Sequence, residues 1–334
     1  MSRPARPLPI ALSCGEPAGI GPELAVKAWQ DLRDSCPFLW LGDPRHLPTG
    51  TDWQEIDNAA EAVDVSASAM PVLRVNFAAP TVPGQLNPDN AAGVIRAIEA
   101  GVALVQSGEA SALCTAPIHK KALIDGAAFA YPGHTEFLAH LGGTPNVVMM
   151  LASPELRVVP ATIHIPLSQV PQQLTADGLR RTIEITAQGL RDQFGLAHPR
   201  IAVAGLNPHA GEDGAMGHEE LDWMRGLIAD MQGGAYTLSG PHPADTMFHA
   251  AARARYDAAI CMYHDQALIP IKTLDFDRGV NVTLGLPFIR TSPDHGTACD
   301  IAGQGIANPS SLIEALRLAQ SMAQRRTPNA ASST

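Results

Sequence analysis

Short apolar runs alternate with longer amphipathic runs along most of the chain. The short runs predict strands at residues 9–14, 37–42, 111–117, 146–151, 156–166, 200–207 and 257–264. The longer runs carry apolar residues at steps of three and four and predict helices at 22–32, 91–108, 174–195, 218–232, 243–256 and 310–326. Apolar strands separated by helices are typical of a mainly parallel sheet covered by helices, so the pattern predicts an α/β fold.

The composition is that of a folded chain with a large core. Of its 334 residues, 46% are hydrophobic and 17% are charged. This length exceeds what one core usually carries, which favours two domains or one large α/β unit. Pro22 and Thr175 stand at the starts of two predicted helices, where such residues are favoured.

Charge and cysteine content exclude several classes of protein. The net charge of −10 provides no general attraction for nucleic acid or an anionic membrane. No apolar run approaches the roughly 18 residues of a membrane span, and the apolar stretch near the amino terminus is too short for a secretory signal. The five cysteines form no C-x-x-C pair, which is typical of reduced thiols. We therefore expect a soluble, cytoplasmic protein.

Three predicted strands each lead to a histidine at or near the carboxyl end. These residues are His164, His209 and His264, separated by 45 and 55 residues. Such spacings fit β-α-β units, and ligands of parallel sheets bind at the carboxyl edge, so the three imidazoles could converge. Three neutral nitrogens with one open position describe a catalytic zinc site. The alternative is that each histidine is a loop or core residue.

Carboxylates stand near these histidines. Asp265 directly follows His264, and Asp245 lies in GPHPADTMF, where Pro243 ends a loop before a predicted helix. Asp245 is either a helix cap or an acid–base group, and the sequence does not decide between the two.

Polar residues inside mixed apolar segments form a second group of candidates. Lys272, Asn281 and Arg290 lie in such segments between residues 269 and 292. On an acidic chain, a Lys and an Arg at such places favour a carboxylate or phosphate ligand, with an ordinary surface as the alternative. His134 and Thr135 precede another apolar helical run, where Thr135 either caps the helix or helps to hold a phosphate.

Seven segments in a fixed order resemble the 4-hydroxythreonine-4-phosphate dehydrogenase family of pyridoxal phosphate biosynthesis. They are GEPAGIGPE, CTAPIHK, YPGHTEFLA, LNPHAGEDGAMGHEE, PHPADTMF, YHDQALIPIK and DHGTACDIAGQGIANP. The last segment is also similar to the adenine-binding stretch of isopropylmalate dehydrogenases, which bind a dinucleotide without a Rossmann fingerprint.

The resemblance implies an isocitrate/isopropylmalate dehydrogenase-like fold. Such a chain has two α/β/α domains with mainly parallel sheets and an active site in the interdomain cleft. Residues 1–126 plus 286–334 are expected to form the dinucleotide-binding domain. Residues 127–285 are expected to form the domain for metal, substrate and dimerisation.

The implied activity is the oxidation of 4-phosphooxy-L-threonine by NAD or NADP. The product, 2-amino-3-oxo-4-phosphooxybutanoate, is a β-keto acid that loses carbon dioxide to give 3-amino-2-oxopropyl phosphate. One divalent metal per subunit is expected, with zinc favoured and magnesium or cobalt as alternatives. The resemblance also implies a homodimer with a shared active site.

The resemblance further implies roles for single residues. His164 of one chain would hold the metal together with His209 and His264 of the other. The implied substrate-binding residues are His134, Thr135, Lys272, Asn281 and Arg290, and the implied cofactor-binding residues are His295, Asp300 and Asn308. We expect the acid–base groups among Lys272, Asp245 and Asp265, with Lys272 or Asp245 moving the hydroxyl proton.

Other functions compete with this interpretation. A paralogue could oxidise another four-carbon phosphorylated acid, such as a threonate or erythronate phosphate. A zinc hydrolase would use the same histidines to activate water but would leave residues 294–309 without a purpose. A phosphate acyltransferase of the same general fold needs no histidine triad. A non-catalytic binding module accounts least well for the many polar residues at the ends of the predicted strands.

Overall fold

The computed structural model describes residues 7–326, which form two compact units. Unit 1 comprises residues 7–145 and 286–324, and unit 2 comprises residues 146–285 with 325 and 326. The resemblance predicts a division of the chain after residue 126, whereas the structure divides it after residue 145. Helix α5 (His134–Leu141) accounts for the difference, because it packs against α3 (Ala91–Ser107) of unit 1.

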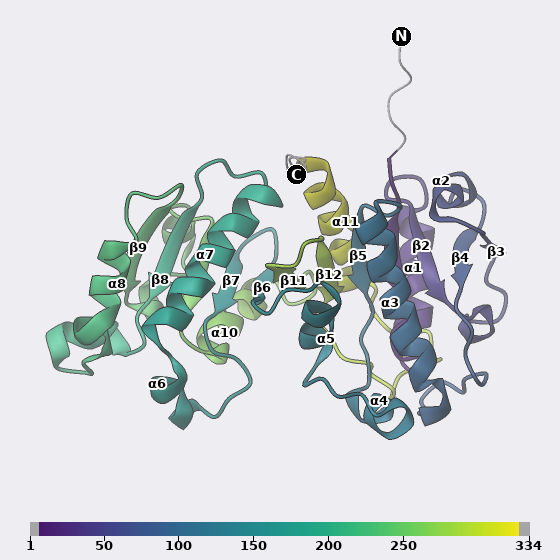
Figure 1. Ribbon diagram of the computed structural model, residues 1–334, viewed down its shortest axis with the longest axis horizontal. Helices are drawn as coiled ribbons and strands as arrows, with labels where there is room; N and C mark the ends of the chain where they lie inside the picture. The colour runs from purple at the N-terminus through teal and green to yellow at the C-terminus, as the bar shows by residue number, and fades with distance from the viewer. Residues whose placement is uncertain (1–6, 327–334) are drawn as a thin grey trace, which may run out of the picture. The chain divides into compact units, whose positions relative to one another are not determined.

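Unit 1 is built on six parallel strands in the order β3-β4-β2-β1-β5-β12. Their bounds are β1 (Ile10–Ser13), β2 (Phe38–Gly42), β3 (Trp53–Glu55), β4 (Met70–Arg74), β5 (Ala112–Thr115) and β12 (Arg290–Pro293). Its other helices are α1 (Gly21–Leu32), α2 (Ala62–Val65), α4 (Lys120–Ala127) and α11 (Ser310–Arg325). Helix α3 packs on β1, β2 and β5 (Figure 1). Because both faces of the central strands are covered, β1 and β2 are fully buried, which explains their continuous apolar sequences.

Unit 2 has the strand order β11-β6-β7-β10-β8-β9. Its strands are β6 (Val148–Ala152), β7 (Arg157–Pro160), β8 (Arg200–Ala204), β9 (Thr237–His242), β10 (Ala258–Cys261) and β11 (Val280–Leu284). Strands β7, β10, β8 and β9 are parallel, while β6 is antiparallel to both of its neighbours. The prediction of a mainly parallel α/β fold is therefore confirmed.

The helices of unit 2 are α6 (Val170–Gln173), α7 (Ala176–Asp192), α8 (Arg225–Asp230), α9 (Ala250–Arg253) and α10 (His264–Leu274). Helix α7 packs on β6 and β11, and α10 packs on β7 and β10 (Figure 1). The Thr175 hydroxyl caps α7 by accepting a hydrogen bond from the Gly178 amide at 3.1 Å, as its place in the sequence predicts.

Two predicted elements differ from the structure. The predicted strand 156–166 ends at Pro160, because the chain turns through bends beyond it and His164 has a φ of 52°. The predicted helix 243–256 is reduced to the 3₁₀ turn η7 (Ala244–Thr246) and the short helix α9.

All five cysteines are free thiols. Four are buried, and burial raises the pKa of Cys36 and of Cys114 to about 12 and the pKa values of Cys14 and Cys261 further still. Cys299 is half-buried. Within residues 7–326, no helix combines the length and the apolar character that crossing a membrane requires.

Candidate active site

The three candidate metal ligands follow three neighbouring parallel strands of unit 2. His164 follows β7, His264 follows β10, and His209 follows β8. Strand β10 pairs with both β7 and β8, so the three carboxyl ends meet at one edge of the sheet. Strand β9 is next to β8, and Asp245 follows it in η7 at the same edge. The topology thus brings these four segments to the edge where parallel sheets bind their ligands.

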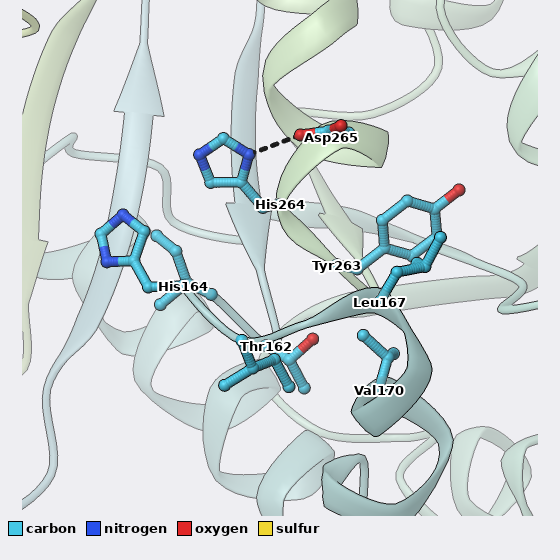
Figure 2. A pocket seen from close by; sticks show the side chains of 9 residues that line it. Thr162, His164, Leu167, Val170, Tyr263, His264 and Asp265 are labelled. Atoms are coloured by element: carbon cyan, nitrogen blue, oxygen red, sulfur yellow. Dashed lines mark hydrogen bonds and ion pairs between the residues drawn. The ribbon is translucent and has the colours of Figure 1, made fainter.

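His164 and His264 lie together in one cavity. Their ring centroids are 5.8 Å apart and the ring planes are inclined by 41°. The cavity has a volume of about 320 Å³ and is lined otherwise by Thr162, Ile163, Ile165, Leu167, Val170, Tyr263 and Asp265. Figure 2 shows the two imidazoles side by side, with the Asp265 carboxylate next to the His264 ring.

Two of these histidines each have a carboxylate near one ring nitrogen. The Nδ1 atom of His264 is 2.7 Å from Oδ1 of Asp265. The Nδ1 atom of His209 is 3.5 Å from Oε2 of Glu212. A carboxylate within hydrogen-bond distance of Nδ1, as at His264, fixes the tautomer and orients the ring so that Nε2 faces a ligand, which is the usual arrangement around metal-binding histidines. Sequence reasoning did not single out Glu212, although it stands three residues after His209 in the same motif.

Two of the histidines have left-handed backbone conformations. The φ angle is 52° at His164 and 53° at His209, and it stays positive through Asp213. For residues other than glycine, this conformation costs roughly 1–2 kcal/mol per residue. Backbone strain of this kind clusters at functional sites, where the surrounding structure holds it in place.

The residues present fit a divalent metal in part. Two imidazoles in one cavity are suitable donors for zinc, cobalt or related ions. However, no three His, Cys, Asp or Glu side chains of one chain are grouped to hold a metal ion within the described part of the molecule. The structure therefore brings His164 and His264 together and leaves His209 outside this pair.

Asp245, Lys272 and Asn281 occupy different elements of unit 2. The exposed Asp245 lies within η7, which packs against the segment that carries His209. Lys272 lies in α10, with its Nζ 5.4 Å from the Phe276 ring centroid. Asn281 lies in β11, and its buried Oδ1 has no hydrogen-bond partner among residues 7–326. A buried, unpaired amide oxygen is a natural contact for a ligand.

The proposed caps at Thr135 and Asp245 are wrong. Helix α5 begins at His134 after Gly133, so Thr135 lies inside its first turn. Pro243 precedes η7 and His249 precedes α9, so Asp245 is at the start of neither element.

A buried cation lies in unit 1. Arg290 of β12 is 3% exposed, and its Nη2 and Nε donate to Oγ1 of Thr115 at 2.8 and 3.2 Å. Burial lowers the pKa of Arg290 to about 10. Burial and the charge of Arg290 also hold the pKa of His134 well below its usual value, so this imidazole is neutral. His134 Nε2 is buried and has no hydrogen-bond partner among residues 7–326.

The segment predicted to bind the cofactor is fixed to α1. Lys27 Nζ donates to the carbonyl oxygens of Gly305 and Ala307 at 2.8 and 2.7 Å. The Glu23 carboxylate accepts from the amide of Gly303 at 2.8 Å. Sequence reasoning missed both residues, because only the fold shows that α1 lies beside residues 303–307.

The three predicted cofactor residues differ in their surroundings. His295 Nδ1 lies 2.9 Å from the Gly296 carbonyl oxygen, and burial lowers the pKa of its imidazole. Asp300 is exposed. Asn308 Oδ1 accepts from the amide of Ser310, the first residue of α11, at 3.0 Å.

Comparisons with known proteins match almost the whole chain. The family model described as pyridoxal phosphate biosynthetic protein PdxA matches residues 34–319. A protein of Ruegeria sp. (strain TM1040) named 4-hydroxythreonine-4-phosphate dehydrogenase is 73% identical over 322 residues, which are 96% of this chain and 99% of that protein.

Solved structures agree with this match. The 4-hydroxythreonine-4-phosphate dehydrogenase of Klebsiella pneumoniae is 37% identical and superposes with a TM-score of 0.85 over 95% of this chain and 100% of that one. The terephthalate 1,2-cis-dihydrodioldehydrogenase of Burkholderia xenovorans LB400 is 28% identical, with a TM-score of 0.67 over 95% and 98% of the two chains. The chain therefore belongs to the family of the pyridoxal phosphate biosynthetic protein PdxA, as its motifs predict.

Proposed function

We propose that this chain oxidises the secondary hydroxyl of 4-phosphooxy-L-threonine with NAD or NADP and a divalent metal, with zinc favoured. Membership of the family and the shared name of its relatives support a 4-hydroxythreonine-4-phosphate dehydrogenase of pyridoxal phosphate biosynthesis. The observation that carries the proposal is the pair of imidazoles at the carboxyl edge of the sheet, 5.8 Å apart in one cavity. The oxidised product is a β-keto acid, so its decarboxylation gives 3-amino-2-oxopropyl phosphate.

We assign the metal to His164 and His264 of one chain and His209 of the partner subunit in a homodimer. The 5.8 Å between the first two rings favours this division over the one in which His164 stands alone. When bound, a divalent ion acts as a Lewis acid on the oxygen that is oxidised. The Asp265 carboxylate orients the His264 ring through Nδ1, so we assign it a positioning role and leave proton transfer to other groups.

We assign the anionic parts of the substrate to the cations and hydrogen-bond donors of the predicted set. The buried Arg290, with His134 and Thr135 of α5, supplies positive charge and donors for a phosphate or carboxylate. Lys272 supplies a further cation from unit 2. The unpaired Oδ1 of Asn281 is an acceptor, so we assign it to a hydroxyl or amino group of the substrate.

Proton removal from the hydroxyl falls to Lys272 or Asp245, and two variants distinguish them. K272M removes the Lys272 amine and D245N removes the Asp245 carboxylate. We expect the variant that lacks the base to have a kcat lower by about 10²–10⁴-fold. That variant also loses the acid limb of the pH profile of kcat, since the limb reports the ionisation of the base. Stopped-flow measurement of nicotinamide reduction across pH tests this. Retention of the limb in both variants would exclude both residues.

We assign the adenosine part of the dinucleotide to His295, Asp300 and Asn308. A carboxylate at Asp300 accepts hydrogen bonds from ribose hydroxyls and repels a 2′-phosphate. The D300S variant should therefore have a lower ratio of kcat/KM for NAD to kcat/KM for NADP than the wild type. An unchanged ratio in steady-state assays with both cofactors would remove Asp300 from the cofactor site.

The function itself is tested with a panel of four-carbon phosphates. We expect one nicotinamide reduced and one carbon dioxide released for each 4-phosphooxy-L-threonine consumed. Product formation without nicotinamide reduction would indicate a hydrolase. A preference for a phosphorylated acid without the amino group would indicate the paralogue.

The five free thiols agree with a reducing, cytoplasmic location, which we include in the proposal.

A further inference from the structure

The segment that carries His209 is held by a buried carboxylate, Glu220. This residue begins the π-helical turn η6 (Glu220–Met224) and is 1% exposed. Its Oε1 accepts from the backbone amide of Asn207 at 2.8 Å, and its Oε2 accepts from the Asn207 side-chain Nδ2 at 2.9 Å. Both carboxylate oxygens thus bind one residue, two positions before His209.

The backbone around Glu220 is shaped to admit its carboxylate. A Cβ atom at Gly211 would lie 2.8 Å from Oε2 of Glu220, and one at Gly205 would lie 3.0 Å from Oε1. The carboxylate therefore lies between the end of β8 and residues 209–213, which we call the left-handed turn. Gly211 has a φ of 81°, so any other residue there would have a strained backbone and its Cβ would also clash with Oε2 of Glu220.

The left-handed turn has backbone angles that residues with a Cβ rarely adopt. His209, Ala210, Glu212 and Asp213 all have φ angles between 42° and 53°, which is unfavourable for residues with a Cβ. A conformation of this kind persists only where the surroundings determine it. Here the surroundings include the two hydrogen bonds of Glu220 and a contact in which Asn207 Nδ2 donates to Oε2 of Glu219 at 2.7 Å. The Met216 amide also donates to the Gly211 carbonyl oxygen at 3.1 Å, and Arg225 Nη1 donates to Oδ1 of Asp213 at 2.9 Å.

We infer that Glu220 is a positioning residue that fixes the left-handed turn and so directs the His209 imidazole toward the metal. This inference rests on the proposed function, in which His209 is a ligand. Glu220 does not face the cavity of His164 and His264, whose lining residues do not include it. It acts through Asn207 and the backbone, as groups behind metal ligands commonly do.

The test is a zinc titration of metal-free protein. The E220Q variant keeps the side-chain volume but has only one oxygen for two donors, so one Asn207 N–H meets an amide NH₂ instead of an acceptor. We expect the zinc Kd of E220Q to rise by about 10–100-fold. Amide hydrogen exchange of residues 207–217, followed by mass spectrometry without metal, should become faster.

Two control variants separate positioning from general stability. E219Q alters one contact to the same Asn207 amide and leaves both Glu220 bonds, so its zinc Kd should stay within about threefold of the wild type. D257N removes carboxylate contacts to Arg200 at the opposite end of β8, and it should lower thermal stability without changing the zinc Kd. A folded E220Q protein with wild-type zinc affinity would overturn the inference, as would an equal loss of affinity in D257N.

Two further variants keep the test decisive. If E220Q does not fold, N207A removes the side-chain donor and leaves the Glu220 carboxylate in place, and it should also weaken zinc binding. H209A distinguishes the two levels of failure. Unchanged zinc affinity in H209A rejects the proposed ligand set and the role of Glu220 with it. Lost affinity in H209A with wild-type affinity in both E220Q and N207A rejects Glu220 alone.

Discussion

Replacing His264 with alanine should remove the bound metal and lower kcat/KM about a thousandfold or more. Lewis-acid stabilisation is worth several kcal/mol, and each 1.4 kcal/mol is about tenfold in rate. The imidazole of His264 is central to the site because it lies beside His164 and is oriented by Asp265. Elemental analysis of the purified variant, together with nicotinamide reduction at saturating metal, measures both effects.

The matched comparison for H264A is D265N, which keeps the imidazole and removes its carboxylate partner. We expect D265N to retain the metal at high concentration, with an affinity about 10–100-fold weaker than that of the wild type. Full metal occupancy in H264A would show that this histidine is not a ligand. Equal affinity in D265N and the wild type would remove Asp265 from its positioning role.

Mixing H164A chains with H209A chains should restore activity that neither variant has alone. In the proposed homodimer, one site of each heterodimer receives intact His164 and His264 from one chain and intact His209 from the other. Random pairing of equal amounts makes half of the dimers mixed, so about a quarter of all sites should recover. The measurement is activity after unfolding and refolding of the mixture, with subunit exchange verified by mass spectrometry of differently tagged chains.

Two other mixtures determine which histidines share a chain. Mixing H209A with H264A should also restore about a quarter of the sites, because His209 and His264 come from different chains in our assignment. Mixing H164A with H264A should restore none. The reverse pattern in these two mixtures would assign His164 to one chain and the other two histidines to its partner. No recovery in any mixture would leave a site within a single chain.

The central strands could be predicted from the sequence because burial on both faces favours apolar residues at nearly every position. Phe38–Gly42 and Ala112–Thr115 are entirely buried, and their apolar runs predict them closely. Strand β9 was missed for the converse reason. Its sequence TLSGPH lies at the edge of the sheet, and only Leu238 is fully buried, so no apolar alternation marks it.

The proximity of His164 and His264 could be predicted in outline but not in geometry. Strand ends followed by histidines predict a common sheet edge, and the neighbouring order of β7, β10 and β8 explains why that expectation holds. The left-handed conformations of His164 and His209 could not be predicted, since a positive φ is uncommon for any residue other than glycine. Glu220 was likewise missed, because a buried glutamate is recognised only when the donors around it are known.

The unequal burial of the cysteines has a practical consequence for measuring nucleotide binding. Alkylating reagents attack the thiolate, and burial suppresses its formation at Cys14, Cys36, Cys114 and Cys261. Maleimide should therefore label the native protein at Cys299, the one partly accessible thiol. Since Cys299 directly precedes Asp300, a fluorophore attached there would report on the surroundings of the assigned adenosine site without any engineered cysteine.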